Sequence, residues 1–246
     1  MGPDDSLICQ IGLAHFRAPC SVQMAEVVEL PQKGALRFKN RSHAGRRLAR
    51  RLDHLRYQPT VVLGLPRGGI PVGFEVARRL SAPLEALLVR KLGAPLYPEL
   101  AIGALGEEGI RIVDENRVMR LGITAQQIAH VERRERRELA RQAELFRHGR
   151  PAADLQGKTA VIVDDGIATG FTALAACSIT RQLGAGRIVV ATPVAPRQAP
   201  AMFESTVDEF VAVATPRRLR AIGLFYADFQ PTEDHEVIRL LERAQD

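Results

Sequence analysis

Two adjacent acidic residues stand at the end of an apolar run, and a loop rich in glycine and threonine follows them. The run is Val161–Val163, the acids are Asp164 and Asp165, and the loop continues to Thr172. Carboxylates accept hydrogen bonds from sugar hydroxyls, and they are oxygen ligands of the kind that Mg²⁺ prefers. Loop amides and the N-terminus of a following helix form a site for a phosphate. Together these features indicate a site for a phosphorylated sugar.

The residue types in the loop suit this chemistry. Gly166 and Gly170 allow the backbone to approach a ligand closely, and Thr169 and Thr172 add hydroxyl donors. The alternative interpretation is an acidic strand end followed by an ordinary turn. The residues that we expect around the phosphate are Gly166, Ile167, Ala168, Thr169, Gly170, Phe171 and Thr172.

This stretch resembles the phosphoribosyl diphosphate (PRPP) motif of the type I phosphoribosyltransferases, in which two acids precede the pattern x-x-x-Thr-Gly-x-Thr. The resemblance implies that Asp164 and Asp165 contact the ribose hydroxyls and bind Mg²⁺ directly, through water or through PRPP. It implies that residues 166–172 wrap the 5′-phosphate. Phe171 departs from the family pattern, where a small residue is more usual, but the hydrogen-bond donors of the loop are kept.

A second candidate group follows the earlier apolar run Thr60–Leu65. It consists of Arg67, Gly68 and Gly69. The glycine spacing is superficially that of a P-loop, but Ile70 stands where a P-loop has lysine, so a P-loop NTPase is disfavoured. The resemblance assigns pyrophosphate binding to this loop through its amides and its basic side chain. The alternative is a plain strand–turn–helix corner with a solvated arginine.

Basic residues also end the next predicted strand, Leu84–Val89. The resemblance assigns a pyrophosphate contact to Lys91, and alternation along a strand directs Arg90 to the opposite face. Residues 94–108 correspond in the family to a mobile flap that closes over PRPP, with Tyr97 and Glu99 as candidate contacts. The alternative for Lys91 is an ordinary solvated strand end. The alternative for the flap is that Tyr97 packs against the protein and Glu99 is solvated.

An aromatic cluster lies near the C-terminus, within residues 221–229, which we call the hood after its family counterpart. Phe225, Tyr226 and Phe229 stand close together in a chain that is only 5% aromatic. Such rings could stack on a flat acceptor such as a base. A hydrophobic clasp onto the main core is at least as well supported.

The elements that must position these residues alternate between strands and helices. Apolar runs predict strands at 60–65, 84–89, 101–105, 110–113, 159–163, 187–191 and 207–212. Helical spacing and caps predict a helix that Ser42 caps and helices at 70–80, 125–147, 172–183, 196–204 and 233–244. This order predicts an α/β fold, a parallel sheet flanked by helices, with a long added helix and a small C-terminal hood, similar to type I phosphoribosyltransferases.

Length and charge limit the remaining choices. The chain has 246 residues, which we divide into an N-terminal extension, 1–34, and one phosphoribosyltransferase-like domain, 35–246. The net charge is +6, and two arginine-rich segments, 41–56 and 130–150, account for all of it. Both are best interpreted as solvated faces or subunit contacts, with a phosphate contact from Arg41 as an option. Nucleic-acid binding is not favoured, because no aromatic residues interleave and no known motif is present.

Other classes are excluded by what the sequence lacks. No apolar run is long enough to span a membrane, and the first residues do not form a secretory signal. Three widely spaced cysteines and six histidines show no spacing for a disulfide framework or a metal site. We therefore expect a cytoplasmic protein.

The resemblance implies a phosphoribosyltransferase that uses PRPP and Mg²⁺ and releases pyrophosphate. Homodimers are common in the family, but the sequence itself does not indicate the oligomeric state. The acceptor is unidentified, and a nitrogenous base is the expected class. The alternative is a non-catalytic regulatory protein on this fold that senses PRPP or a nucleotide and binds RNA or DNA. PRPP synthesis is disfavoured, because the sequence offers no second nucleotide-binding half.

Overall fold

A sheet of parallel strands forms the centre of the described part of the chain. The computed structural model describes residues 23–24 and 37–245. Neighbouring strands follow the order β1-β9-β8-β7-β2-β3, and every pair is parallel. The strands are β1 (Gln23–Met24), β2 (Thr60–Gly64), β3 (Leu84–Ala86), β7 (Thr159–Val163), β8 (Arg187–Val194) and β9 (Glu209–Ala214). The predicted α/β class is confirmed.

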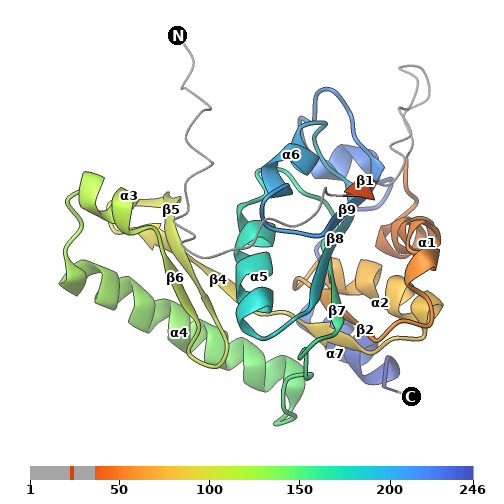
Figure 1. Cartoon of the computed structure of the whole chain (residues 1–246), viewed down its shortest axis with the longest axis horizontal. Helices are drawn as coiled ribbons and strands as arrows, with labels where there is room; N and C mark the ends of the chain where they lie inside the picture. The colour runs from red at the N-terminus through yellow and green to blue at the C-terminus, as the bar shows by residue number, and fades with distance from the viewer. Residues whose placement is uncertain (1–22, 25–36, 246) are drawn as a thin grey trace.

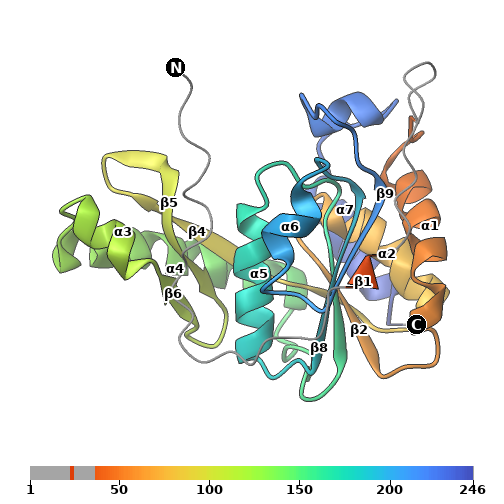
Figure 2. The same cartoon turned by 45° about the horizontal axis from the view of Figure 1, so that its top comes forward.

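Helices cover both faces of this sheet (Figures 1 and 2). One face carries α1 (Arg41–Arg51), α2 (Gly69–Leu80) and α7 (Asp234–Arg243), and the other carries α5 (Phe171–Gln182) and α6 (Ala199–Phe203). Strand β7 shows how the sequence builds these layers. Val161 and Val163 pack with the first group of helices, whereas Ala160 and Ile162 pack with the second. A strand that is buried on both faces must be apolar throughout.

The predicted cap of helix α1 is wrong. Asn40, not Ser42, precedes the helix, and its side chain accepts a hydrogen bond from the His43 N–H at 2.9 Å. Ser42 lies inside the first turn. Asparagine and serine cap helices about equally well, so the sequence alone does not discriminate between the two positions.

A second, antiparallel sheet stands beside the central one and contains β4 (Val89–Ala94), β5 (Tyr97–Gly106) and β6 (Arg111–Val113). We call it the flap sheet. The single strand predicted at 84–89 is wrong, because β3 ends at Ala86 and β4 begins at Val89 in the other sheet. The Leu87 N–H still bonds to the Gly64 carbonyl, so the chain leaves the central sheet between these residues. The run is apolar except for Glu85, and nothing in its composition between Ala86 and Val89 marks the change of sheet.

The strands predicted at 101–105 and 110–113 are confirmed within β5 and β6, but β5 begins earlier, at Tyr97, inside the segment that corresponds to the family's flap. Glycines of β4 and β5 allow the backbones of neighbouring strands to pack closely. A Cβ at Gly103 would lie 2.3 Å from the Ile112 carbonyl oxygen, and one at Gly93 would lie 2.3 Å from that of Pro98. These positions accept no side chain, so glycine is compatible with the strand pairing here.

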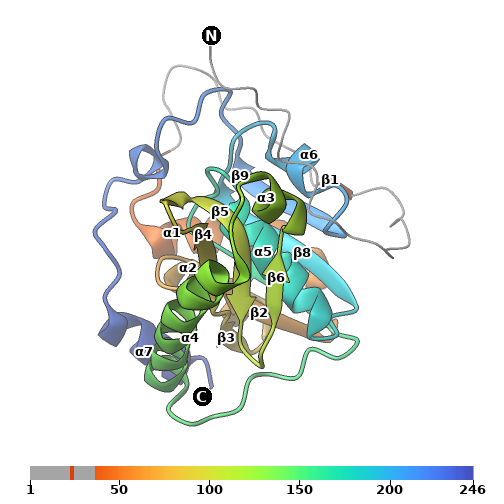
Figure 3. The same cartoon turned by 90° about the vertical axis from the view of Figure 1, so that its left-hand side faces the viewer.

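Helix α4 (Ala125–Arg147) packs along β4 on the far side of the flap sheet from α5, as Figure 3 shows. Its predicted bounds are confirmed, because Thr124 and Gln127 form a capping box at its start and His148 adopts a left-handed conformation at its end. The last residue of α4, Arg147, bonds to Glu85 of β3 and to Glu107 after β5, both at 2.8 Å. This buried arginine therefore ties α4, the flap sheet and the central sheet together.

Three shorter elements complete the described chain: η2 (Asp53–Leu55), α3 (Glu115–Arg120) and η3 (Ile222–Phe225). Part of the predicted N-terminal extension joins the central sheet, because Gln23 and Met24 pair with Glu209 and Phe210 of β9. The rest of residues 1–34 lies outside the described residues. Among those described, no helix is both long and apolar enough to cross a membrane.

Candidate active site

The two predicted loops meet at the carboxyl ends of β2 and β7. These strands are neighbours, and the Leu65 N–H bonds to the Val163 carbonyl at 2.9 Å. A Cβ at Gly68 would lie 2.1 Å from Oδ2 of Asp165, and one at Gly69 would lie 2.4 Å from the Val163 carbonyl oxygen. Only glycine fits at either position. The peptide bond that precedes Arg67 is cis.

The acid pair lies in a confined environment. Oδ1 of Asp164 accepts a hydrogen bond from the Asp165 N–H at 2.9 Å. Burial raises the pKa of Asp164 to about 8, and the adjacent Asp165 adds to this rise. Burial also raises the pKa of Asp165, while the hydrogen bond from Arg41 opposes the rise. The raised pKa values favour a shared proton on the pair, and a bound cation would favour its release.

Arg41 was named from the sequence only as an optional phosphate contact, and its pairing with Asp165 was not foreseen. Its Nε lies 2.7 Å from Oδ2 of Asp165, and the two side chains are 13% and 14% exposed. Its Nη1 donates to the Gln230 carbonyl at 2.7 Å, and the guanidinium lies 4.1 Å from the centre of the Phe229 ring. In the sequence Arg41 is one of several arginines in a segment expected to be solvated. Nothing local separates it from the others, because its partners lie more than 120 residues away.

The predicted phosphate loop reaches α5 through Gly170, which has φ +74° and precedes the helix with no side-chain cap. Gly166 packs against the hood, since a Cβ there would lie 2.3 Å from Cγ2 of Ile222. Ile167 is buried in the core, and Phe171 is half-buried. The exposed members of the loop are Ala168, Thr169 and Thr172. The backbone and two hydroxyls can therefore meet a ligand, as predicted.

The hood contacts the acid pair through Tyr226. Its hydroxyl donates to the Asp165 carbonyl at 2.6 Å, and its ring lies 5.3 Å from that of Phe38 and 4.8 Å from that of Phe229. Tyr226 is 1% exposed, so its ring forms the clasp and offers no face for stacking on an acceptor, which corrects that expectation for this residue. Phe225 and Phe229 are half-buried against the same cluster.

Comparison with known proteins identifies the family. Residues 36–213 match the family model of the phosphoribosyl transferase domain. The chain belongs to this family. A Mycobacterium tuberculosis protein, provisionally named a phosphoribosyl transferase and found in two strains, is 50% identical over 207 residues. The match covers 84% of this chain and 47% of the relative, so the chain spans about half the length of the curated relatives it matches.

A similar solved structure supports the fold. The crystal structure of TT1426 from Thermus thermophilus is 41% identical, with a TM-score of 0.76. The match covers 84% of this chain and 98% of TT1426.

The remaining predicted residues of this phosphoribosyl transferase domain lie after β2 and on the flap sheet. Arg67 is exposed and approaches Asp234 at 3.5 Å. Lys91 lies on β4 of the flap sheet instead of at the end of a central strand, and its Nζ donates to the Glu99 carbonyl at 3.2 Å. Tyr97 and Glu99 are exposed on β5. None of these four side chains contacts the acid pair directly in the described structure.

The family implies Mg²⁺, and the donor set can be tested against it. The described residues contain no group of three or more His, Cys, Asp or Glu side chains that could hold a metal ion. Asp164 and Asp165 thus offer two adjacent carboxylates without a third protein ligand. Mg²⁺ keeps several waters and takes phosphate oxygens from its substrate, so it needs few protein ligands. The pair fits Mg²⁺ that arrives with a phosphorylated ligand.

Proposed function

We propose that this domain is a phosphoribosyltransferase that binds PRPP with Mg²⁺ and transfers the 5-phosphoribosyl group to a nitrogenous acceptor, releasing pyrophosphate. The observation that supports this most strongly is the convergence of two loops at one edge of the sheet. Gly68 of the first loop lies so close to Asp165 of the second that no side chain fits between them. A pyrophosphate site and a ribose site that lie in contact with each other suit one ligand that carries both groups.

In this proposal each part of the site binds one part of PRPP. Asp164 and Asp165 accept hydrogen bonds from the ribose hydroxyls, and residues 166–172 bind the 5′-phosphate through amides and hydroxyls. The amides of Gly68 and Gly69 bind pyrophosphate, with Arg67 and Lys91 as the nearby cations. Bound Mg²⁺ would neutralise charge on the leaving pyrophosphate.

The reaction exchanges one bond at C1 of the ribose for another. The bond to the pyrophosphate oxygen breaks and takes the electron pair with it, and the acceptor nitrogen donates its lone pair to C1. Positive charge develops on the ribose ring in between. The carboxylates of Asp164 and Asp165 favour that charge, and the loops hold the two ends of the ligand in place. Catalysis is thus mainly positioning and electrostatic stabilisation.

The test is isothermal titration with PRPP and Mg²⁺. We expect saturable binding that Asp165→Asn weakens at least tenfold, because the substitution removes a charged acceptor. Asp154→Asn is the matched control, since Asp154 is an exposed carboxylate paired with Lys158 away from the site. Absence of PRPP binding, or binding that Asp165→Asn leaves unchanged, would refute the proposal.

A screen of nitrogenous acceptors for PRPP-dependent pyrophosphate release then identifies the acceptor. The regulatory alternative predicts a different result. No acceptor would release pyrophosphate, and RNA or DNA would bind with steep salt dependence that charge reversal at Arg133, Arg134 and Arg137 weakens. Ion pairs within the chain hold Arg141 and Arg147 of α4, whereas Arg133 and Arg137 are exposed, so the salt dependence of binding is the measurement that decides between the two.

A further inference from the structure

A cavity of about 340 Å³ lies between β4, α4 and the first turn of α5. Lys91 and Thr172, which line it, belong to the site already described. Arg90, Arg134 and Glu135 also line it, and they come from the contact between the flap sheet and the long helix. The family resemblance assigns no role to these three residues, and α4 is an addition to the family's minimal core.

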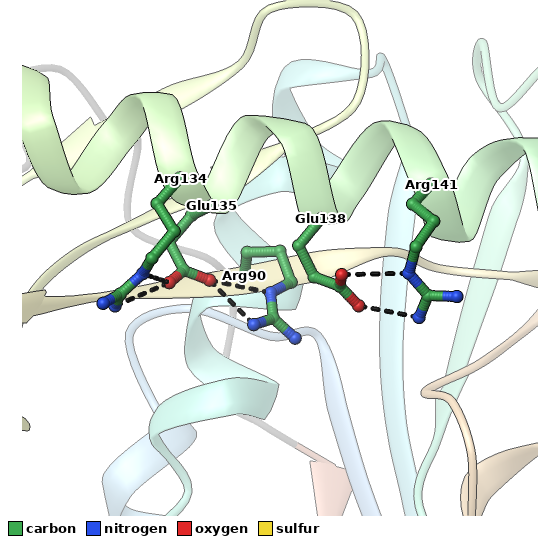
Figure 4. Close-up of polar contacts among 5 residues, drawn as sticks. All are labelled: Arg90, Arg134, Glu135, Glu138 and Arg141. Atoms are coloured by element: carbon green, nitrogen blue, oxygen red, sulfur yellow. Dashed lines mark hydrogen bonds and ion pairs between the residues drawn. The ribbon is translucent and has the colours of Figure 1, made fainter.

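A buried carboxylate fixes the two arginines. Oε2 of Glu135 accepts hydrogen bonds from Nε and Nη2 of Arg90 at 3.0 and 2.7 Å. Oε1 accepts from Nε of Arg134 at 3.0 Å, and Nη2 of Arg134 lies 2.9 Å from it. Figure 4 shows Glu135 between the two guanidinium groups. The Glu135 side chain is 8% exposed, whereas those of Arg90 and Arg134 are 33% and 65% exposed. One edge of each guanidinium is thus held, and other N–H groups can meet a ligand.

The charge of the cavity suits an anion. Arg90, Arg134 and Lys91 outnumber Glu135, which leaves two positive charges around the space. No acidic residue lies in the first turn of α5, so its free N–H groups add to this potential. Guanidinium groups whose orientation is fixed match the geometry of phosphate oxygens. The exposed hydroxyl of Thr172 completes a set of donors on two sides of the cavity.

We propose that this cavity binds a phosphate group, with Arg90 and Arg134 as ligand contacts that Glu135 orients. The ligand class is a phosphomonoester or free phosphate. The assignment of that group to the 5′-phosphate end of PRPP rests on the proposed function, because Thr172 belongs to both sites. The long helix thereby contributes to ligand binding and does more than cover the flap sheet.

Titration of ribose 5-phosphate and of inorganic phosphate into the full chain tests the proposal. Arg134→Gln should weaken the binding of ribose 5-phosphate about tenfold, the effect of losing one charge-assisted hydrogen bond. Arg137→Gln is the matched control, because Arg137 is exposed on the same helix, carries the same charge and does not line the cavity. It should change binding less than about twofold, as expected for a screened surface charge.

Glu135→Gln separates orientation from charge. It makes the cavity more positive, so attraction by charge alone would tighten phosphate binding. If Glu135 orients the arginines, as we propose, binding weakens instead. Thermal unfolding checks that this variant folds. Arg134→Lys provides a second comparison: it keeps the charge but loses the paired N–H donors of the guanidinium, so we expect an intermediate affinity.

The outcomes distinguish this inference from the proposed function. Equal affinities of Arg134→Gln and the wild type for ribose 5-phosphate and phosphate would overturn the inference, even if PRPP-dependent pyrophosphate release is observed. Arg134-dependent binding of ribose 5-phosphate without such release would support the inference and refute the enzyme. Tighter binding of ribose 5-phosphate than of inorganic phosphate assigns the cavity to a sugar phosphate, and the reverse order assigns it to free phosphate.

Discussion

Replacing Arg41 with Met should destabilise the fold by about 3 kcal/mol at pH 8. The substitution keeps the apolar stem but removes a contact of 2.7 Å to Asp165, a second of 2.7 Å to the Gln230 carbonyl and the stacking on Phe229. Breaking a buried ion pair by removing one partner costs about 3–5 kcal/mol. We take the lower end of that range, because Asp165 can reduce the cost by binding a proton.

The control is Arg46→Met on the same helix. Arg46 bonds to buried Glu75 at 2.8 Å, but Arg78 also bonds to Glu75 at 2.8 Å, so that carboxylate keeps a partner. We expect a loss below about 1 kcal/mol, the range of exposed pairs. Urea unfolding with an unchanged m value measures both losses. If Arg41→Met costs no more than Arg46→Met, the assignment of Arg41 as the partner of Asp165 is wrong.

The loss should also depend on pH. The Arg41 hydrogen bond lowers the pKa of Asp165, so in the Arg41→Met variant this pKa is higher in the folded state than in the wild type. A folded-state pKa above the unfolded value gives stability that is present at low pH and is lost as the pH rises. The difference between variant and wild type should therefore grow from pH 5 to pH 8. A constant difference over this range would contradict the reasoning.

Three further predictions concern the site and its support. Because burial raises the pKa of Asp164 to about 8, binding of PRPP with Mg²⁺ at pH 7 should release close to one proton. Calorimetric titration in buffers of different ionisation enthalpy measures this proton release, which should vanish near pH 9. Gly68→Ala should weaken PRPP binding at least tenfold, since its Cβ would lie 2.1 Å from Oδ2 of Asp165; an unchanged dissociation constant would contradict the geometry. Arg147→Met should lower the free energy of unfolding by about 3–5 kcal/mol, measured in urea, because it leaves two partly buried carboxylates without their shared partner.

The sequence predicted the elements whose signals are local. Helix α4 has a capping box at Thr124 and a stop at His148 and Gly149, and both of its predicted ends are confirmed. Strand β7 is a short apolar run between polar residues, and its bounds agree as well. In the flap sheet, the separate strand β4 and the early start of β5 at Tyr97 were missed for the opposite reason. The Leu84–Ala94 stretch carries no turn signal where it changes sheets. Gly93 of β4 and Gly103 of β5 reflect close contacts with Pro98 and Ile112 on the neighbouring strands.

The same distinction applies to the site. The acid pair, the two loops and their glycines follow from short patterns, because each pattern is a strand, a turn and the start of a helix. Arg41 and Tyr226 join the site from positions 124 and 61 residues away from Asp165. No spacing rule reports such contacts, and the aromatic cluster was ambiguous because stacking and clasping require the same residue types. Burial of Tyr226 decides for the clasp at that position.

Arginine content was the least informative feature of the sequence, and the structure shows why. Arg41, Arg90 and Arg147 each bond to a carboxylate that is largely buried, so their charges act at defined places inside the chain. Arg133 and Arg137 lie exposed on the outer side of the same long helix. The net charge counts both groups of arginines. The exposed arginines can attract a large anionic partner, whereas the arginines held by a buried carboxylate can orient a small ligand. The net charge therefore does not distinguish a phosphorylated metabolite from nucleic acid, because it does not record which arginines have a buried carboxylate partner.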